Sequence, residues 1–257
     1  AFNATALKWH TCAWLLLPVL VFLAGWMHWY AALPLTLLTA AGLAPRKRKE
    51  PQTRDSLPAF PLFTRSSFLA LAAFAALMAL SGWGEWVNQH PDHIVRNACL
   101  RELVASPWPV IFPDGNVLIY NTGFWLVPAL AGKLAGLDAA RMLVVLWGAW
   151  GLFLSWLWLC VFSGRRSLLL ALLMAAFGSL LNLQCWLGLN LFRLHYFGTA
   201  EQIMCSANAS IPVLLFFIFL ASGRMPLYWM PILFAATAFY SPLAALGGLP
   251  LAACQWR

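Results

Sequence analysis

Carboxylates that could act as acids or bases are concentrated in one stretch of this sequence. Of its eight acidic residues, five lie between positions 84 and 138. They are Glu85, Asp92, Glu102, Asp114 and Asp138. A carboxylate that is ionised and within hydrogen-bond reach of a hydroxyl can act as a general base. The stretch 84–138 is therefore where the sequence predicts a polar functional site.

Asp92 is the main candidate for a general base. Arg96 follows one helical turn later and would favour the ionised carboxylate. The Pro91-Asp92 pair is also typical of a helix start, so helix capping is the alternative role, compatible with the first because a carboxylate has two oxygens. His90 and His93 flank Asp92 and raise the question of a metal. The ligand set is thin, however, and surface histidines without a role are the alternative, so no metal site is predicted.

Further residues expected on the same face are predicted to contact a substrate. They are Glu85, His93, Arg96, Glu102, Tyr120, Lys133, Arg193, His195 and Gln202. Tyr120, with Phe124 and Trp125, could line a groove for a sugar or a lipid headgroup, or form an aromatic belt at a membrane interface. Arg193 and His195 could hold a phosphate, with snorkelling to the interface as the alternative for Arg193.

The segments that must position these residues are strongly apolar. Hydrophobic residues make up 62% of the 257 residues and charged residues 9%, whereas a soluble domain carries about 25% charged residues. Fifteen tryptophans also suit a protein that meets a bilayer interface. The predicted fold class is all-α: a polytopic transmembrane bundle that forms one domain over residues 1–257.

About eight spans are predicted from the apolar runs. The run Thr11–Ala44 is too long for one span and is split in two at Gly25–Trp29. The others are Phe68–Trp83, Arg141–Phe162, Ser167–Leu187, Ser206–Ala221, Leu227–Tyr240 and Leu243–Cys254. Two outer connections remain, 84–138 and 188–205.

The long connection 84–138 is predicted to contain two helices that lie near the outer interface. One starts near Asp92 and ends at about Ala105. The other covers about Trp125–Leu137, a run that is apolar but too short to cross a bilayer. Asp138 is predicted to cap the next span.

The distribution of basic residues predicts how this bundle is oriented in the membrane. With the N-terminus in the cytoplasm, eleven of the sixteen lysines and arginines fall on the inner face and five on the outer face. The positive-inside rule then places 84–138 outside. Because the basic residues cluster in short loops beside apolar spans, the net charge of +8 does not indicate a nucleic-acid partner. Membrane lipids are the expected surroundings.

The six cysteines show no CxxC motif and no zinc-like spacing with histidine. Most fall within predicted spans and are expected to be small buried apolar residues. Cys99 and Cys205 are expected at the outer face, where a disulfide between them is an open alternative.

The long outer connection contains a series of short motifs. They are Asp92-x3-Arg96-Asn-Ala-x-Leu-x-Glu-Leu103, Trp108-Pro-Val110, Leu118-x-Tyr120 and Leu126-x-Pro-Ala-x-x-Gly-Lys133. This series resembles the first outer loop of the C superfamily of integral-membrane glycosyltransferases, a group that includes protein O-mannosyltransferases, the aminoarabinose transferases of lipid A and bacterial homologues. Ser241-Pro242 with Leu246-Gly-Gly-Leu-Pro250 is similar to a later span of the same proteins.

The resemblance implies a fold and an activity. Asp92 would activate an acceptor hydroxyl on the outer side of a bacterial inner membrane. The donor would be a polyprenyl-phosphate sugar, and the acceptor a lipid, a glycan or a protein. No cofactor is implied, and a single acid at this position, with Glu85 seven residues earlier, does not favour a divalent metal. Family members usually have more spans, so the chain is expected to be a fragment.

Two other classes of function remain open. A transporter or flippase usually has polar residues or helix breaks inside its spans, whereas the spans here are nearly free of charge. A non-catalytic membrane subunit would not need a long connection rich in carboxylates. Both are retained as alternatives to the glycosyltransferase.

Overall fold

The computed structural model describes residues 4–45, 64–87, 89–120, 122–177, 199–250 and 253. Within these ranges the regular structure is helical, apart from one isolated antiparallel bridge between Ile111 and Val117. The helices are α1 (Ala4–Trp26), α2 (Trp29–Leu43), α3 (Arg65–Leu80), α4 (Pro91–Ala105), α5 (Gly123–Ala135), α6 (Leu137–Ser163), α7 (Leu168–Ala176), α9 (Thr199–Ala221), the short 3-10 helix η2 (Leu227–Trp229), α10 (Met230–Tyr240) and α11 (Pro242–Gly247). The all-α fold class is confirmed for these residues.

Three of these helices are long and apolar enough to cross a membrane. They cover Thr5–Trp26, Leu137–Ser163 and Thr199–Ala221. The other apolar segments are shorter, and α2 and α3 have 15 and 16 residues, compared with about 20 for a perpendicular crossing. The chain is therefore compatible with a membrane protein, but a bundle of about eight spans is not confirmed. The predicted spans Ser167–Leu187 and Leu243–Cys254 run partly outside the described residues.

Several local predictions are confirmed. The first apolar run breaks within Gly25–Trp29, because α1 ends at Trp26 and α2 begins at Trp29 after an extended residue. The two helices predicted in 84–138 are α4, which ends at Ala105, and α5, which begins two residues before Trp125.

The structure shows neither the capping role considered as an alternative for Asp92 nor the cap predicted at Asp138. The residue that caps α4 is His90, whose Nδ1 accepts a hydrogen bond of 3.3 Å from the backbone N–H of Asp92. Pro91 occupies the first turn of α4, and so Asp92 lies inside the helix rather than before it. Helix α6 begins after Gly136, without a side-chain cap. Asp138 lies in its first turn, where a negative charge still complements the helix dipole.

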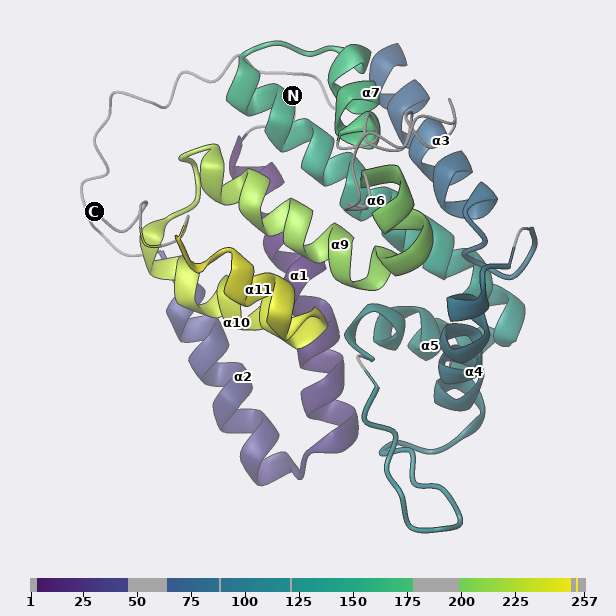
Figure 1. Ribbon diagram of the computed structural model, residues 1–257. Coiled ribbons are helices and arrows are strands. Elements are labelled where there is room, and N and C mark those ends of the chain that lie inside the picture. The colour runs from purple at the N-terminus through teal and green to yellow at the C-terminus, as the bar shows by residue number, and fades with distance from the viewer. Residues whose placement is uncertain are drawn as a thin grey trace.

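Helix α6 forms the centre of the molecule, packed against α3, α5 and α9 (Figure 1). Glycines allow this close packing. A Cβ added at Gly151 would lie 2.6 Å from Ile211 on α9 and 2.7 Å from the ring of Trp14 on α1. A Cβ at Gly148 would lie 2.3 Å from Met78 on α3. Small residues at such positions let helices approach in apolar surroundings.

Aromatic side chains connect α1 to α6 and α10. The ring of Trp14 stacks on Trp147 and on Tyr240, with centroid distances of 5.1 and 5.7 Å. Its indole N–H donates to the Trp147 carbonyl at 3.0 Å, and the Tyr240 hydroxyl donates to the Trp14 carbonyl at 3.0 Å. Some of the fifteen tryptophans are thus core residues rather than interface residues.

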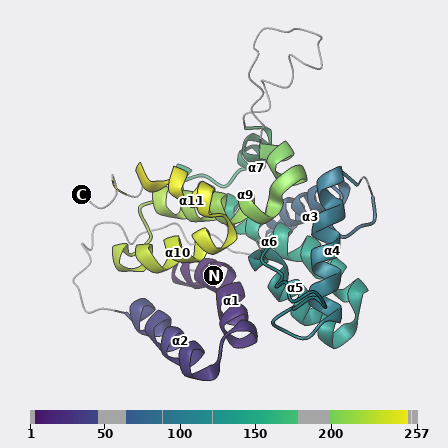
Figure 2. The ribbon, with the colours of Figure 1, turned by 60° about the horizontal axis from the view of Figure 1, so that its bottom comes forward.

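The turns between helices lie at two opposite ends of the molecule. In Figure 1 the α1–α2 turn, α4 and α5 lie in the lower half, whereas the end of α6 and the starts of α3 and α7 lie at the top. Figure 2 shows α4 and α5 side by side from another direction. The predicted outer connection 84–138 is thereby separated from the basic turn Ser163–Arg166.

Candidate functional site

The candidate site is a cluster of Trp83, Asp92, His93 and Arg96, called here the Arg96 cluster. Trp83 lies in the turn after α3, and the other three residues lie in α4. His93 is fully buried and Arg96 is only 6% exposed. The Arg96 guanidinium lies 5.7 Å from the centroid of the Trp83 ring, a cation–π geometry, and the His93 ring meets Trp83 edge-on at 5.1 Å. The buried face of α4 therefore carries a cation and an imidazole.

A break in helix α9 holds this cluster in place. Ser206 has non-helical backbone angles, φ −151° and ψ 40°, inside α9. Carbonyls before such a break lose partners in the helical ladder and need other donors. The indole N–H of Trp83 donates to the Ile203 carbonyl at 2.8 Å, and His93 Nε2 bonds to the Met204 carbonyl at 3.1 Å. The turn after α3 and helix α4 are thus attached to the broken helix through Trp83 and His93.

The Arg96 cluster contains polar atoms that lack partners. Nε and Nη1 of Arg96 and Nδ1 of His93 are buried without a hydrogen bond to any described residue. A carbonyl can only accept, so Nε2 of His93 carries the proton and Nδ1 is left as an acceptor in the neutral ring. Burial lowers the pKa of His93 and so favours this neutral form. Buried donors and acceptors without partners are rare and indicate a place for a ligand or a water.

Asp92 remains accessible beside the buried cation. Its side chain is 53% exposed. Its Oδ2 lies 3.6 Å from Arg96 Nη2 and 3.7 Å from His90 Nδ1. Both distances exceed a normal hydrogen bond, so these contacts leave the carboxylate free to accept a proton from another molecule.

Glu85 belongs to a different group of charges. Its Oε2 accepts hydrogen bonds from Arg101 and, at 2.6 Å, from Arg141. Arg141 also donates to Asp138 at 2.8 Å. Burial by itself would raise the pKa of Glu85, but the two arginine hydrogen bonds outweigh it and hold the pKa below its ordinary value. We call Glu85, Arg101, Asp138 and Arg141 the Glu85 network; it joins the turn after α3 to α4 and α6.

The other predicted site residues have separate positions. Glu102 accepts a hydrogen bond of 3.2 Å from the Ser106 hydroxyl in the last turn of α4. Lys133 donates to the Ser106 carbonyl, where a cation suits the helix dipole. Tyr120 packs against Trp125 at 5.8 Å. Gln202 directly precedes Ile203 and so lies next to the Arg96 cluster, and Arg193 and His195 lie outside the described residues.

Two features of the site were not predicted from the sequence: the Trp83 anchor and the break in α9. A signal for the break exists, because Ser206, Asn208 and Ser210 interrupt an otherwise apolar run. Polar residues inside such a run often mark functional positions. The buried Oδ1 of Asn208 also lacks a partner among the described residues.

The cysteine alternative is settled by the structure. Cys99 and Cys205 are both free thiols and buried, so the disulfide considered above is not formed. Burial raises the pKa of Cys99 to about 12, which makes it an inert core residue. Across the described ranges, no group of three or more His, Cys, Asp or Glu side chains could hold a metal ion.

No family model, curated protein or solved structure matches this chain. Its function must therefore be inferred from the site itself.

Proposed function

We propose that this protein is a membrane glycosyltransferase of the C-superfamily type, which moves a sugar from a polyprenyl-phosphate donor to a hydroxyl acceptor. The observation that carries the proposal is the pairing of an accessible carboxylate, Asp92, with a buried cation, Arg96, two of whose guanidinium nitrogens have no hydrogen-bond partner among the described residues. The acceptor is a lipid, a glycan or a protein. The site would face outward from a bacterial inner membrane.

These two residues suit the two halves of a glycosyl transfer. The acceptor oxygen bonds to the anomeric carbon as the bond from that carbon to the phosphate oxygen breaks. Asp92 takes the proton of the acceptor hydroxyl, as a general base within reach of solvent. The leaving lipid phosphate gains negative charge, and a positioned guanidinium such as Arg96 stabilises that charge in the transition state.

The direct test is Asp92→Asn in the full chain, reconstituted in vesicles with a synthetic polyprenyl-phosphate sugar and a soluble acceptor. We expect transfer to fall by about 10²–10⁴-fold, as for loss of a general base. The melting temperature should change little, because Asp92 does not cap α4. Glu102→Gln is the matched control on the same helix and should retain transfer. Normal transfer by Asp92→Asn would overturn the assignment.

The proposed architecture has about eight spans, with α4 and α5 lying at the outer interface. Single cysteines at Asn116 and Arg165, introduced into a cysteine-free background, test the orientation of the chain in the membrane. We expect a membrane-impermeant maleimide to label position 116 in intact cells and position 165 only after permeabilisation. Labelling in the reverse pattern would place the Arg96 cluster in the cytoplasm and exclude an outward-facing site.

One observation favours a second candidate, a lipid transporter or flippase. The break at Ser206 interrupts a helix of span length, and discontinuous helices form the binding sites of many transporters. The vesicle assay separates the two candidates. A flippase would move a labelled polyprenyl phosphate across the bilayer without an acceptor, and Asp92→Asn would leave that movement unchanged.

A further inference from the structure

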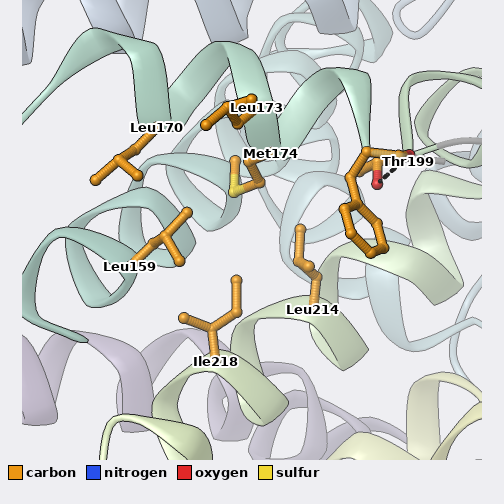
Figure 3. Close-up of a pocket in the computed structure, with 8 residues that line it drawn as sticks. Leu159, Leu170, Leu173, Met174, Thr199, Leu214 and Ile218 are labelled. Atoms are coloured by element: carbon orange, nitrogen blue, oxygen red, sulfur yellow. Dashed lines mark hydrogen bonds between the residues drawn. The ribbon is translucent and has the colours of Figure 1, made fainter. Parts of the chain in front are cut away.

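An apolar groove lies between α6, α7 and α9, with a cavity volume of about 320 Å³. Its lining includes Leu159 from α6, Leu173 and Met174 from α7, and Leu214 and Ile218 from α9. Figure 3 shows these side chains converging on a common space from three helices. The groove therefore lies where three helices of the bundle meet.

The lining of the groove suits a hydrocarbon chain and little else. Thr199 is the one polar residue among the described residues that line it. Its hydroxyl already donates to the Phe177 carbonyl at 3.2 Å, shown as the dashed line in Figure 3. The described part of the lining offers no free polar group, so a sugar or a phosphate placed against it would lose hydrogen bonds to water.

One end of this groove lies beside basic residues. Leu159 is followed by the end of α6 at Ser163 and then by Arg165, which is exposed. Ile218 is followed by the end of α9 at Ala221 and then by Arg224. Leu159 lies four residues before the end of α6 and Ile218 three residues before the end of α9, so at about 1.5 Å per residue both are within about 6 Å of the helix ends that lead to these arginines. The same turn also contains Arg166, whose guanidinium donates to the Ser67 hydroxyl and lies over the Trp156 ring, so Arg165 is the cation exposed to a headgroup in this turn.

We propose that the groove binds one acyl chain of an anionic phospholipid, whose phosphate lies against Arg165 and its basic neighbours. The apolar lining takes the chain, and the charge of the turn selects an anionic headgroup, as basic residues beside helix bundles do. The turn is at the end of the molecule opposite to α4 (Figure 1). This lipid is thus distinct from the proposed sugar donor, and the inference does not depend on the proposed function.

The test uses the purified full chain, delipidated in detergent. Phosphatidylglycerol and phosphatidylcholine with identical acyl chains are added, and the melting temperature and the bound lipid in native mass spectra are measured. We expect phosphatidylglycerol to bind with saturation and raise the melting temperature, and phosphatidylcholine to bind more weakly. Arg165→Gln should weaken phosphatidylglycerol about fivefold, equivalent to about 1 kcal/mol for one surface cation, and leave phosphatidylcholine unchanged.

A groove-filling variant tests the position of the chain. Leu173→Trp should abolish saturable binding of phosphatidylglycerol. Leu172→Trp is the matched control, because Leu172 is the neighbouring residue of α7, is 66% exposed and does not line the groove. If Leu173→Trp fails to fold, the two lipids and Arg165→Gln still decide the question.

Three outcomes would overturn the proposal. One is an equal response to both phospholipids. The second is a Leu173→Trp variant that binds phosphatidylglycerol like the unchanged protein. The third is displacement of phosphatidylglycerol by a polyprenyl phosphate of higher affinity, which would assign the groove to an isoprenoid chain instead.

Discussion

Glu85 and Asp92 are seven residues apart in the chain, but their carboxylates are surrounded in opposite ways. Glu85 is 9% exposed at its side chain, and two arginines share its Oε2. Asp92 is mostly exposed, and its nearest cation, Arg96, lies beyond hydrogen-bond distance at 3.6 Å. The Glu85 network pairs its charges in ion pairs within the protein, although Glu85 Oε1 and Arg141 Nε are also buried without a hydrogen-bond partner among the described residues. The Arg96 cluster leaves buried N–H groups without partners among the described residues.

From this difference we infer a stabilising role for the Glu85 network and a functional role for the Arg96 cluster. A charge that is desolvated without full pairing lowers the stability of the fold. Proteins keep such groups chiefly where function requires them. We therefore expect substitutions in the Glu85 network to change stability and substitutions in the Arg96 cluster to change activity. The following predictions test this division.

The largest effect is expected for Arg96→Met. Transfer should fall by about 10²-fold or more, because the charge that develops on the leaving phosphate loses its cation. Stability should stay the same or rise by about 1 kcal/mol, because an apolar side chain replaces an incompletely paired buried cation. Transfer rate and chemical denaturation of the same preparations provide the measurements. Unfolding of Arg96→Met would show that the guanidinium is structural.

The matched substitution Arg101→Met should behave in the opposite way. Arg101 lies in the same helix but is 54% exposed and pairs with Glu85. Its loss should reduce stability while transfer per folded molecule remains close to normal. Similar losses of activity in both variants would remove the contrast between the two regions.

A smaller effect is expected for Glu85→Gln. Removing the charge weakens the hydrogen bonds to Arg101 and Arg141, which should lower the free energy of unfolding by about 1–2 kcal/mol. Transfer should be much less affected than in Asp92→Asn. If Glu85→Gln lost as much transfer as Asp92→Asn at unchanged stability, both carboxylates would be assigned to the reaction.

The smallest effect concerns pH and His93. Its pKa in the folded protein lies below the ordinary value of 6.5, chiefly because of burial. Between the lower folded pKa and the unfolded pKa, the unfolded chain therefore binds more protons than the folded one. The stability contributed by neutral His93 is fully present above pH 6.5 and decreases as the pH falls below that value. Melting temperatures from pH 8 to 5 should show this step, and His93→Gln should remove it.

Local features of the structure could be predicted from neighbouring residues in the chain. Pro91 and the polar run after it indicated where α4 begins, and a short apolar run indicated α5. The spacing of Asp92 and Arg96 placed them on one helical turn, where the structure pairs them. The capping errors at Asp92 and Asp138 have a local cause too, because a helix start shifted by one or two residues moves a side chain from the cap into the first turn.

The sequence by itself determined the helical, strongly apolar character of the chain, the two helices of 84–138 and the concentration of carboxylates there, because these depend on residue type and short-range spacing. Only the tertiary structure decided which of these carboxylates is buried between two arginines and which is exposed. The hydrogen bond from Arg141 to Glu85 joins residues 56 positions apart, and the bonds from Trp83 to Ile203 and from His93 to Met204, beside Asp92, join residues 120 and 111 positions apart. Such contacts depend on how distant segments of the chain meet in the folded protein, and no short-range pattern specifies them.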